Sequence, residues 1–165
     1  MIRMAEVCDA ADYRNLIENL EAESDFLLFG KGERKSTIEQ VEGLIQKVEK
    51  EENSTIFLSE LNGEVIGHVT VFGGGAPRII HTASVITGVL KEFHGQGSAK
   101  ELFLRLFEWA EEKGVIRLEL TVMVHNERAV HFYEGMGFEK EGVKRQSLIV
   151  SGRPVDEYVM AKILV

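Results

Sequence analysis

Cysteine, proline and long apolar runs are scarce in this sequence. Cys8 is the only cysteine among 165 residues, which excludes an intramolecular disulfide, and no Cys/His cluster has the spacing of a zinc site. The two prolines, Pro77 and Pro154, lie in no linker-like stretch. No apolar run approaches the roughly 20 residues that span a bilayer, and residues 1–6 lack the apolar core of a signal peptide. These absences predict one cytoplasmic domain over residues 1–165, with no membrane partner and no metal site.

Positive charge is also in short supply. The chain has 19 Lys and Arg against 27 Asp and Glu, a net charge of −8. A net-acidic chain gains little from the counterion release that drives nucleic-acid binding, so we expect no nucleic-acid partner. An acidic surface attracts cationic small molecules or basic peptide segments instead. The composition, 44% hydrophobic and 28% charged, is that of an ordinary globular protein and excludes wholesale disorder.

The N-terminal half alternates between helical and extended patterns. Residues 2–7 predict a short strand, and the segment 9–12, with Asp at each end, offers caps for a helix that runs to about Leu20. Residues 36–39, Ser-Thr-Ile-Glu, fit a capping box ahead of a second helix. Asn62-Gly63 separates two β-branched runs and therefore predicts a hairpin.

The C-terminal half adds the elements of a mixed sheet. Residues 78–90 are extended and β-branched, and an amphipathic helix follows that Gly114 ends. Residues 115–124 predict a buried strand, residues 126–136 a helix, and residues 143–164 a second hairpin. This order of elements predicts an α/β (α+β) domain built on one mixed sheet.

The most informative segment runs from Thr87 to Ala99. A strand ends, the residues His-Gly-Gln-Gly of 94–97 follow, and an amphipathic helix begins at once. Backbone amides at the positive end of a helix suit a pyrophosphate, and glycine allows close approach because it has no Cβ. Taken alone, the pattern is equally typical of an ordinary glycine-rich turn. A P-loop pattern is absent, as is the third glycine of the dinucleotide fingerprint.

Two segments together resemble the GCN5-related N-acetyltransferases. Residues 94–99, His-Gly-Gln-Gly-Ser-Ala, are similar to that family's Gln/Arg-x-x-Gly-x-Gly/Ala signature. Residues 126–138 are similar to its Asn-x-x-Ala-x-x-x-Tyr-x-x-x-Gly-Phe segment. The resemblance implies a mostly antiparallel central sheet flanked by helices, in which one parallel strand pair forms an acetyl-CoA cleft. It also implies an N-acetyltransferase that acts on a primary amine of a small molecule or a peptide N-terminus, and a possible homodimer.

The resemblance assigns roles to individual positions. The amides of 95–100 would bind the acetyl-CoA pyrophosphate, with His94 within reach of a phosphate, and the main chain of 87–89 would bind the pantetheine and the acetyl carbonyl. Asn126 would bind the pantetheine, and Tyr133 would protonate the leaving thiolate. Without the resemblance, Asn126 is equally typical of a helix N-cap, and the apolar helical row around Tyr133 favours a core tyrosine. The acetyl-CoA positions are Thr87, Gly88, Val89, His94, Gly95, Gln96, Gly97, Ser98, Ala99, Lys100, Asn126 and Tyr133.

The general base is the position at which the sequence departs from the family. Some peptide-acetylating members carry a glutamate where this chain has Thr121. Glu119 lies two residues earlier, so it projects from the same face of the strand and is the best available carboxylate. His81 is the second candidate, and a water relay without a direct base is also open. The missing glutamate leaves an alternative function, a non-catalytic CoA- or peptide-binding module of the same fold.

Overall fold

A seven-stranded sheet organises the protein, whose computed structural model describes residues 1–165. Its strand order is β1-β2-β3-β4-β5-β7-β6, and every neighbouring pair is antiparallel except β4 and β5. The strands are β1 (Ile2–Met4), β2 (Thr55–Leu61), β3 (Glu64–Gly73), β4 (Thr82–Val89), β5 (Arg117–Met123), β6 (Glu139–Val150) and β7 (Arg153–Ile163). The predicted mixed, mostly antiparallel sheet is confirmed, as are both predicted hairpins, β2–β3 and β6–β7.

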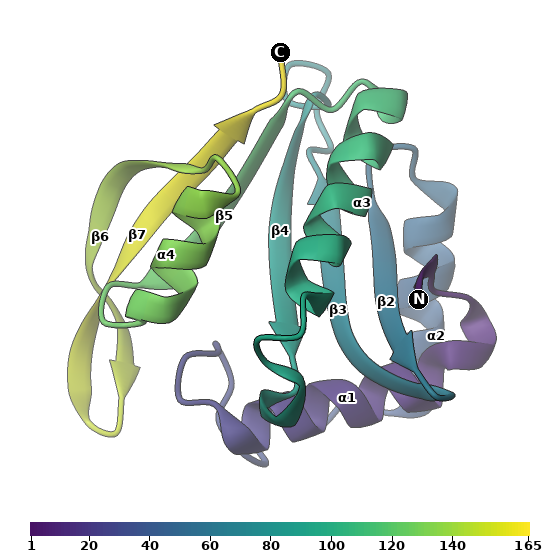
Figure 1. Ribbon diagram of the computed structural model, residues 1–165, viewed down its shortest axis with the longest axis horizontal. Helices are drawn as coiled ribbons and strands as arrows, with labels where there is room; N and C mark the ends of the chain where they lie inside the picture. The colour runs from purple at the N-terminus through teal and green to yellow at the C-terminus, as the bar shows by residue number, and fades with distance from the viewer.

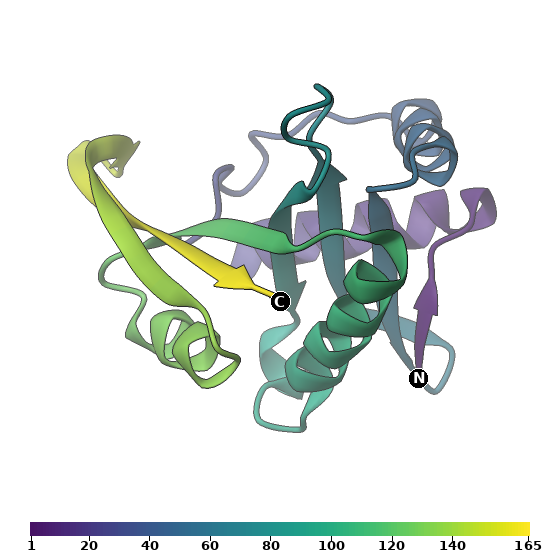
Figure 2. The ribbon, with the colours of Figure 1, turned by 90° about the horizontal axis from the view of Figure 1, so that it is seen from above.

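Helices cover both faces of this sheet (Figures 1 and 2). One face carries α1 (Ala10–Glu23) and α2 (Ile38–Lys50), and the other carries α3 (Ser98–Lys113) and α4 (Glu127–Gly135). Two short 3-10 turns, η1 (Val7–Asp9) and η2 (Lys91–Phe93), precede α1 and α3. Each face has its own apolar core, centred on fully buried Leu16 and Ile45 beneath α1 and α2, and on Phe103 and Leu118 beneath α3 and α4. No helix has both the length and the apolar character needed to cross a membrane.

The parallel pair β4–β5 divides the sheet into two parts. The two strands pair only from Thr82–Arg117 to Ser84–Glu119, after which β4 continues to Val89 without a neighbour on that side. Figure 1 shows the strands diverging from this point, with α3 on one side of the gap and α4 on the other. The sheet is therefore open in its middle, beside the start of α3.

The β4 strand begins later than the pattern of residues 78–90 predicts. The chain turns tightly ahead of Thr82, whose amide donates to the Ile79 carbonyl at 3.0 Å. Asn53 holds the same turn through a 3.1 Å bond from Nδ2 to the Ile80 carbonyl. These local bonds override the β propensity of two exposed isoleucines, since those side chains have no sheet surface to pack on.

The first two helices are capped differently from the prediction. Asp9 occupies the N-cap of α1 but makes no bond to the first turn of that helix. Ahead of α2 the capping box is one residue later than predicted, because Thr37 and Gln40 exchange the two bonds at 3.1 and 2.9 Å. The Ser36 carbonyl accepts a hydrogen bond from the Nε of Arg14 at 2.7 Å.

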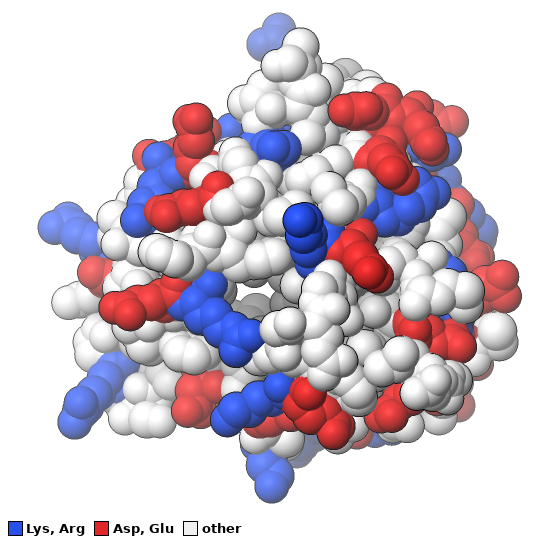
Figure 3. All heavy atoms as spheres, viewed as in Figure 1, with Lys and Arg blue, Asp and Glu red and all other residues white.

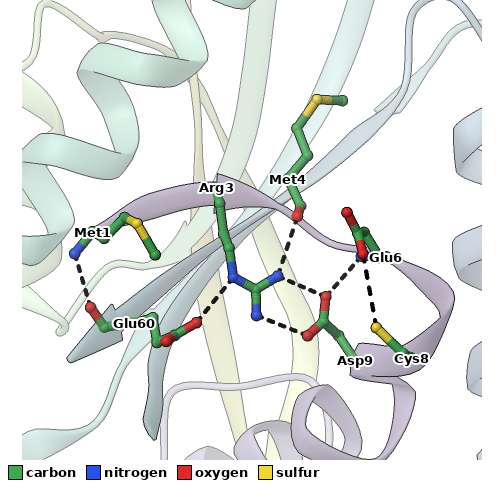
Figure 4. A network of polar contacts seen from close by, with 7 residues as sticks. All are labelled: Met1, Arg3, Met4, Glu6, Cys8, Asp9 and Glu60. Atoms are coloured by element: carbon green, nitrogen blue, oxygen red, sulfur yellow. Dashed lines mark hydrogen bonds and ion pairs between the residues drawn. The ribbon is translucent and has the colours of Figure 1, made fainter. Parts of the chain in front are cut away.

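Asp9 is instead paired with Arg3 of β1 (Figure 4). The guanidinium donates to both carboxylate oxygens at 2.7 and 2.8 Å, and its Nε donates to Glu60 of β2 at 2.9 Å. The Glu6 amide also donates to Asp9, at 2.7 Å. The bonds from Arg3 hold the pKa of Asp9 below its usual range. The cluster fastens β1 and η1 to the end of β2.

Candidate active site

The loop between β4 and α3 presents a row of free backbone amides. Gly95 and Gly97 have φ angles of 76° and 91°, a conformation that favours glycine, and they turn the chain into α3. None of the amides from Gly95 to Lys100 donates a hydrogen bond within the protein, and the first bond of the helix runs from Glu101 to Gly97. Free donors at the positive end of a 16-residue helix can bind a pyrophosphate, and a Cβ at either glycine would meet nothing within 4 Å.

Two side chains fix the position of this loop. The Nε2 of His94 donates to the carbonyl of Val89 at 2.7 Å, since a carbonyl oxygen can only accept. Glu23, the last residue of α1, accepts from the Lys91 amide at 2.6 Å. His94 therefore joins the loop to the end of β4, and its contact with a phosphate stays a prediction.

The backbone of β4 is free along the gap. Bonds between β3 and the residues Thr82 and Leu90 show that the even-numbered residues of this strand pair with β3. The backbone groups of Thr87 and Val89 therefore point into the gap, where the family resemblance implies a pantetheine. Gly88 turns its backbone groups toward β3 instead, which corrects the expectation that its main chain reaches the cleft.

Gly88 contributes close packing instead of a cleft-facing bond. A Cβ on this residue would lie 2.8 Å from a methyl carbon of Leu20, so α1 approaches the strand closely because no side chain intervenes. This contact sets the distance between α1 and β4.

Asn126 and Tyr133 belong to the same element, the first as the N-cap of α4 and the second within the helix. Asn126 caps α4, as its Oδ1 accepts from Ala129 at 3.3 Å, and its Nδ2 has no partner within the protein. Tyr133 packs its ring against Phe103 with 5.8 Å between centroids. Its hydroxyl has no partner and is not fully enclosed. Burial raises the pKa of Tyr133 to about 12, so the hydroxyl is protonated and can donate at neutral pH.

The two candidate bases lie in different places. Glu119 stands where the β4–β5 pairing ends, on the sheet face that carries α1 and α2. Arg117 donates twice to its Oε2, at 3.2 and 3.1 Å, and also binds Glu141. The Oε1 of Glu119 has no partner. His81 precedes β4 at the closed end of the strand pair, away from the gap.

A space-filling view of the face that carries α3 and α4 shows a hollow between these two helices (Figure 3). Lys and Arg side chains lie at its rim, although the chain as a whole is acidic. Positive charge at the rim of this hollow favours a polyanion there.

Sequence reasoning missed several polar residues on the opposite face of the sheet. His68 joins a buried chain in which Thr70 bonds both to it and to Tyr13. A groove above them is lined by Tyr13, Arg14, Ile17, Glu18, Arg34, Ser36, Val41, Leu44, His68, Thr70, Phe72 and Ile86. No local motif could have identified this groove, because its residues come from α1, α2, the loop between them, β3 and β4.

Glu157 is a further carboxylate that no motif of the sequence singles out. It lies on β7 opposite Met123, is only 9% exposed, and accepts from Ser147 at 2.8 Å. Its carboxylate supports an irregular stretch of β6, in which pairing with β7 is interrupted between Lys144 and Leu148.

Known proteins are similar to this chain over most of its length. Residues 16–138 match the Acetyltransferase (GNAT) family. The L-amino acid N-acetyltransferase AaaT of Escherichia coli (strain K12) is 34% identical over 104 residues, which make up 62% of this chain and 64% of that protein. The alignment thus spans less than two thirds of AaaT, and only 36% of the N-acetyltransferase YdgE of Bacillus subtilis.

Solved structures extend the likeness to the whole chain. An acetyltransferase of the GNAT family from Streptococcus pneumoniae superimposes with a TM-score of 0.95 at 30% identity, covering 99% of this chain and 98% of that one. YncA of Salmonella typhimurium, solved with its cofactor acetyl-CoA, gives a TM-score of 0.89 at 18% identity over 100% of this chain and 94% of that one. The latter shows a shared fold.

Proposed function

This chain belongs to the acetyltransferase (GNAT) family, and we propose that it transfers the acetyl group of acetyl-CoA to a primary amine of a small molecule or a peptide N-terminus. The observation that carries the proposal is the row of free amides from Gly95 to Lys100 beside the open gap between β4 and β5. The name of the relative AaaT, an L-amino acid N-acetyltransferase, supports an amine as acceptor.

The residues along the cleft would bind successive parts of acetyl-CoA. The amides from Gly95 to Lys100 would hold the pyrophosphate. The carbonyl of Thr87 and the backbone groups of Val89 would bond to the pantetheine amides in the way a neighbouring strand would. The unpartnered Nδ2 of Asn126 would donate to the pantetheine from the other side of the gap. Backbone groups make most of these contacts. A histidine at position 94, where the family has Gln or Arg, should therefore lower the affinity for acetyl-CoA only slightly.

Acetyl-CoA supplies a thioester, whose carbonyl carbon is open to attack by a neutral amine. In our proposal the amide of Thr87 stabilises the negative charge that develops on the carbonyl oxygen as the carbon–nitrogen bond forms. Tyr133 donates its proton to the sulfur as the carbon–sulfur bond breaks. A raised pKa suits this role, because the hydroxyl keeps its proton until the thiolate develops.

The amine must lose a proton in the course of the reaction. We propose that Glu119 takes this proton, directly or through water, on its free Oε1. Arg117 fixes the carboxylate by its other oxygen, so the side chain is positioned at the point where the gap begins. Glu119 lies on the α1/α2 face of the sheet, whereas α3 lies on the other face. The acceptor would therefore approach Glu119 from the α1/α2 face.

Transfer is direct in this proposal, without an acyl-enzyme. The single cysteine, Cys8, lies on η1 beside β1, and β2 and β3 separate β1 from β4. No thiol therefore lies within reach of the gap. The amine attacks the thioester in a ternary complex.

Calorimetric titration with acetyl-CoA, followed by a thiol-release assay over a panel of primary amines, tests the proposal. We expect saturable binding and CoA release that depends on the amine. Binding without release for any amine would favour the alternative of a non-catalytic CoA-binding module. Absence of binding at millimolar acetyl-CoA would contradict both.

The outer strand β6 supports a homodimer. It is the last strand of the sheet, 12 residues long, and nearly all of its residues are exposed. An unpaired edge of this length is a template for pairing with a second chain. We propose that two copies associate along β6 in the cytoplasm. Light scattering on the purified protein measures the molecular mass in solution, which should be that of a dimer.

A further inference from the structure

We propose that the groove on the α1/α2 face binds the carboxylate of the acceptor through Arg34 and His68, so that the acceptor is a free α-amino acid with an apolar side chain. This inference rests on the proposed acetyl transfer and specifies its substrate class. The relevant groups come from the loop between α1 and α2 and from β3.

Arg34 is fixed with part of its guanidinium unused. Its Nε donates to Glu21 at 2.6 Å, and Glu21 is only 4% exposed, so the ion pair holds the arginine on one side. The guanidinium also packs over the ring of Phe29, with 4.4 Å between the Cζ of Arg34 and the ring centroid. Neither terminal nitrogen of Arg34 has a partner within the protein. Two parallel N–H groups in this planar arrangement match the two oxygens of a carboxylate.

His68 places a second donor at the floor of the groove. Tyr13 bonds to Thr70 at 2.8 Å, and Thr70 bonds to the Nδ1 of His68 at 2.9 Å. Tyr13 has no other acceptor, so the arrangement that satisfies every hydrogen runs from Tyr13 to Thr70 to Nδ1. The proton of the neutral imidazole then resides on Nε2.

The Nε2 of His68 faces the groove. It has no partner, and it is not among the fully enclosed unpartnered atoms, although the residue is 98% buried (2% exposed). Burial and the charge of Arg34 lower the pKa of His68 to about 4, so the ring is neutral near pH 7 and donates through Nε2. This N–H has no acceptor within the protein, and an anion in the groove would provide one.

The rest of the groove determines the acceptor's side chain. Its walls include the apolar residues Ile17, Val41, Leu44, Phe72 and Ile86. Its one lining carboxylate, Glu18, is already paired with Arg14 at 2.8 Å. A second ammonium therefore has no free anion to bind, which disfavours a polyamine. A peptide N-terminus carries no carboxylate beside its amine, so it would leave Arg34 and His68 unsatisfied.

The groove adjoins β4, the strand that borders the gap. Ile86 of β4 lines the groove, and the adjacent residue Thr87 turns its backbone to the gap. Neighbouring strands are about 4.8 Å apart, so a carboxylate above β3 lies roughly one strand spacing from the free edge of β4. The α-amino nitrogen of an amino acid is two bonds from its carboxyl carbon. It would point toward the gap when the carboxylate is held by Arg34.

Two probes that differ only in the carboxylate test the proposal: L-leucine and 3-methylbutylamine. CoA release is measured for both with the full-length protein, and rates are expressed per neutral amine. We expect L-leucine to be acetylated with at least a tenfold higher kcat/KM. In Arg34→Gln, kcat/KM for L-leucine should fall about 10- to 100-fold, as for loss of a charged hydrogen bond, while that for 3-methylbutylamine stays unchanged.

Three further variants separate recognition from folding. Arg34→Lys keeps the charge but loses the paired N–H groups, and should lose less than Arg34→Gln. Glu21→Gln combined with Arg34→Gln removes the buried carboxylate that Arg34→Gln would leave unpaired, and should show the same selective loss. Arg105→Gln, a surface arginine of α3 on the opposite face, should leave both substrates unaffected.

Equal kcat/KM for the two probes in the wild type would overturn the carboxylate site. An equal loss for both probes in Arg34→Gln, alone and combined with Glu21→Gln, would overturn it as well. In either case the protein would still bind acetyl-CoA and acetylate an amine. Failure of the proposed function appears differently, as no CoA release from any amine.

Discussion

The Nε2 of His94 and the carbonyl oxygen of Val89 are 2.7 Å apart. This bond joins the end of β4 to the loop that carries the free amides. The strand edge expected to hold the pantetheine and the loop expected to hold the pyrophosphate are thereby fixed relative to each other. A single side chain thus sets the spacing between two parts of the cofactor site.

His94→Ala should weaken acetyl-CoA binding about 5- to 10-fold, since the loop would lose a hydrogen bond worth about 1 kcal/mol. Calorimetry gives the dissociation constant directly. His94→Gln, whose amide can donate to the same carbonyl, should retain most of the affinity. Wild-type affinity in the alanine variant would show that the loop is fixed without this bond.

Gly97→Asp should weaken acetyl-CoA binding at least tenfold, because it places a negative charge beside the pyrophosphate at a residue whose φ is 91°. Gly114→Asp is the matched control, since Gly114 caps the other end of α3 with a φ of 70° and equally open surroundings. Both variants should lose similar stability in a thermal melt. Only the first should lose affinity, and equal affinity in both would remove residues 95–100 from the site.

Tyr133→Phe should lower kcat about 100-fold while the dissociation constant of acetyl-CoA changes little, because only the proton donor is lost. Because burial raises the pKa of Tyr133 to about 12, the wild-type rate should show no loss from its ionisation up to pH 10. Tyr158→Phe on β7 is the control and should leave kcat intact. An unchanged kcat in Tyr133→Phe would exclude it as the acid.

Glu119→Gln should lower kcat about 100-fold near neutral pH if the carboxylate takes the amine proton. Raising the pH should recover part of the rate, since more amine is then neutral without help. Glu141→Gln disturbs the same arginine, Arg117, without removing the candidate base. Equal kcat values in the two variants would favour proton transfer to water.

Asp9→Asn should lower the free energy of unfolding at pH 7 by about 1–3 kcal/mol, the value of a hydrogen bond to a charged group. The folded pKa of Asp9 is depressed, so its contribution is present above the unfolded pKa of about 3.9 and is lost as the pH falls through the folded value. Urea unfolding at pH 7 and at pH 3 and below measures this. The difference from wild type should shrink on acidification, and Asp12→Asn should show little effect at either pH.

The parts of the site that a short segment encodes could be predicted from the sequence. The loop from Gly95 to Lys100 and the cap of α4 at Asn126 depend on neighbouring residues, and both lie where the pattern placed them. Alternation along the strand also put Glu119 and Thr121 on one face. Capping of α2 was wrong by one residue, because Ser-Thr and Glu-Gln pairs offer two equivalent registers.

The acceptor groove could not be predicted because long-range packing creates it. His68 reads as one polar residue in a β-branched run, and only the placement of α1 across β3 brings Tyr13 to its neighbour Thr70. Arg34 reads as one of several charged residues in a loop. Its role depends on the buried partner Glu21, 13 positions away. Residue spacing and composition therefore indicate neither the role of His68 nor that of Arg34.

The short pairing between β4 and β5 has a thermodynamic consequence. Only three register pairs join the two parts of the sheet, so among the strand pairings of the inner sheet this seam should protect its amide hydrogens least in the free protein. A bound molecule that bonds to both edges would take the place of the missing pairs. Resistance to heat should therefore follow the acyl-donor concentration, with a gain of about 2.7 kcal/mol at 100 times the dissociation constant.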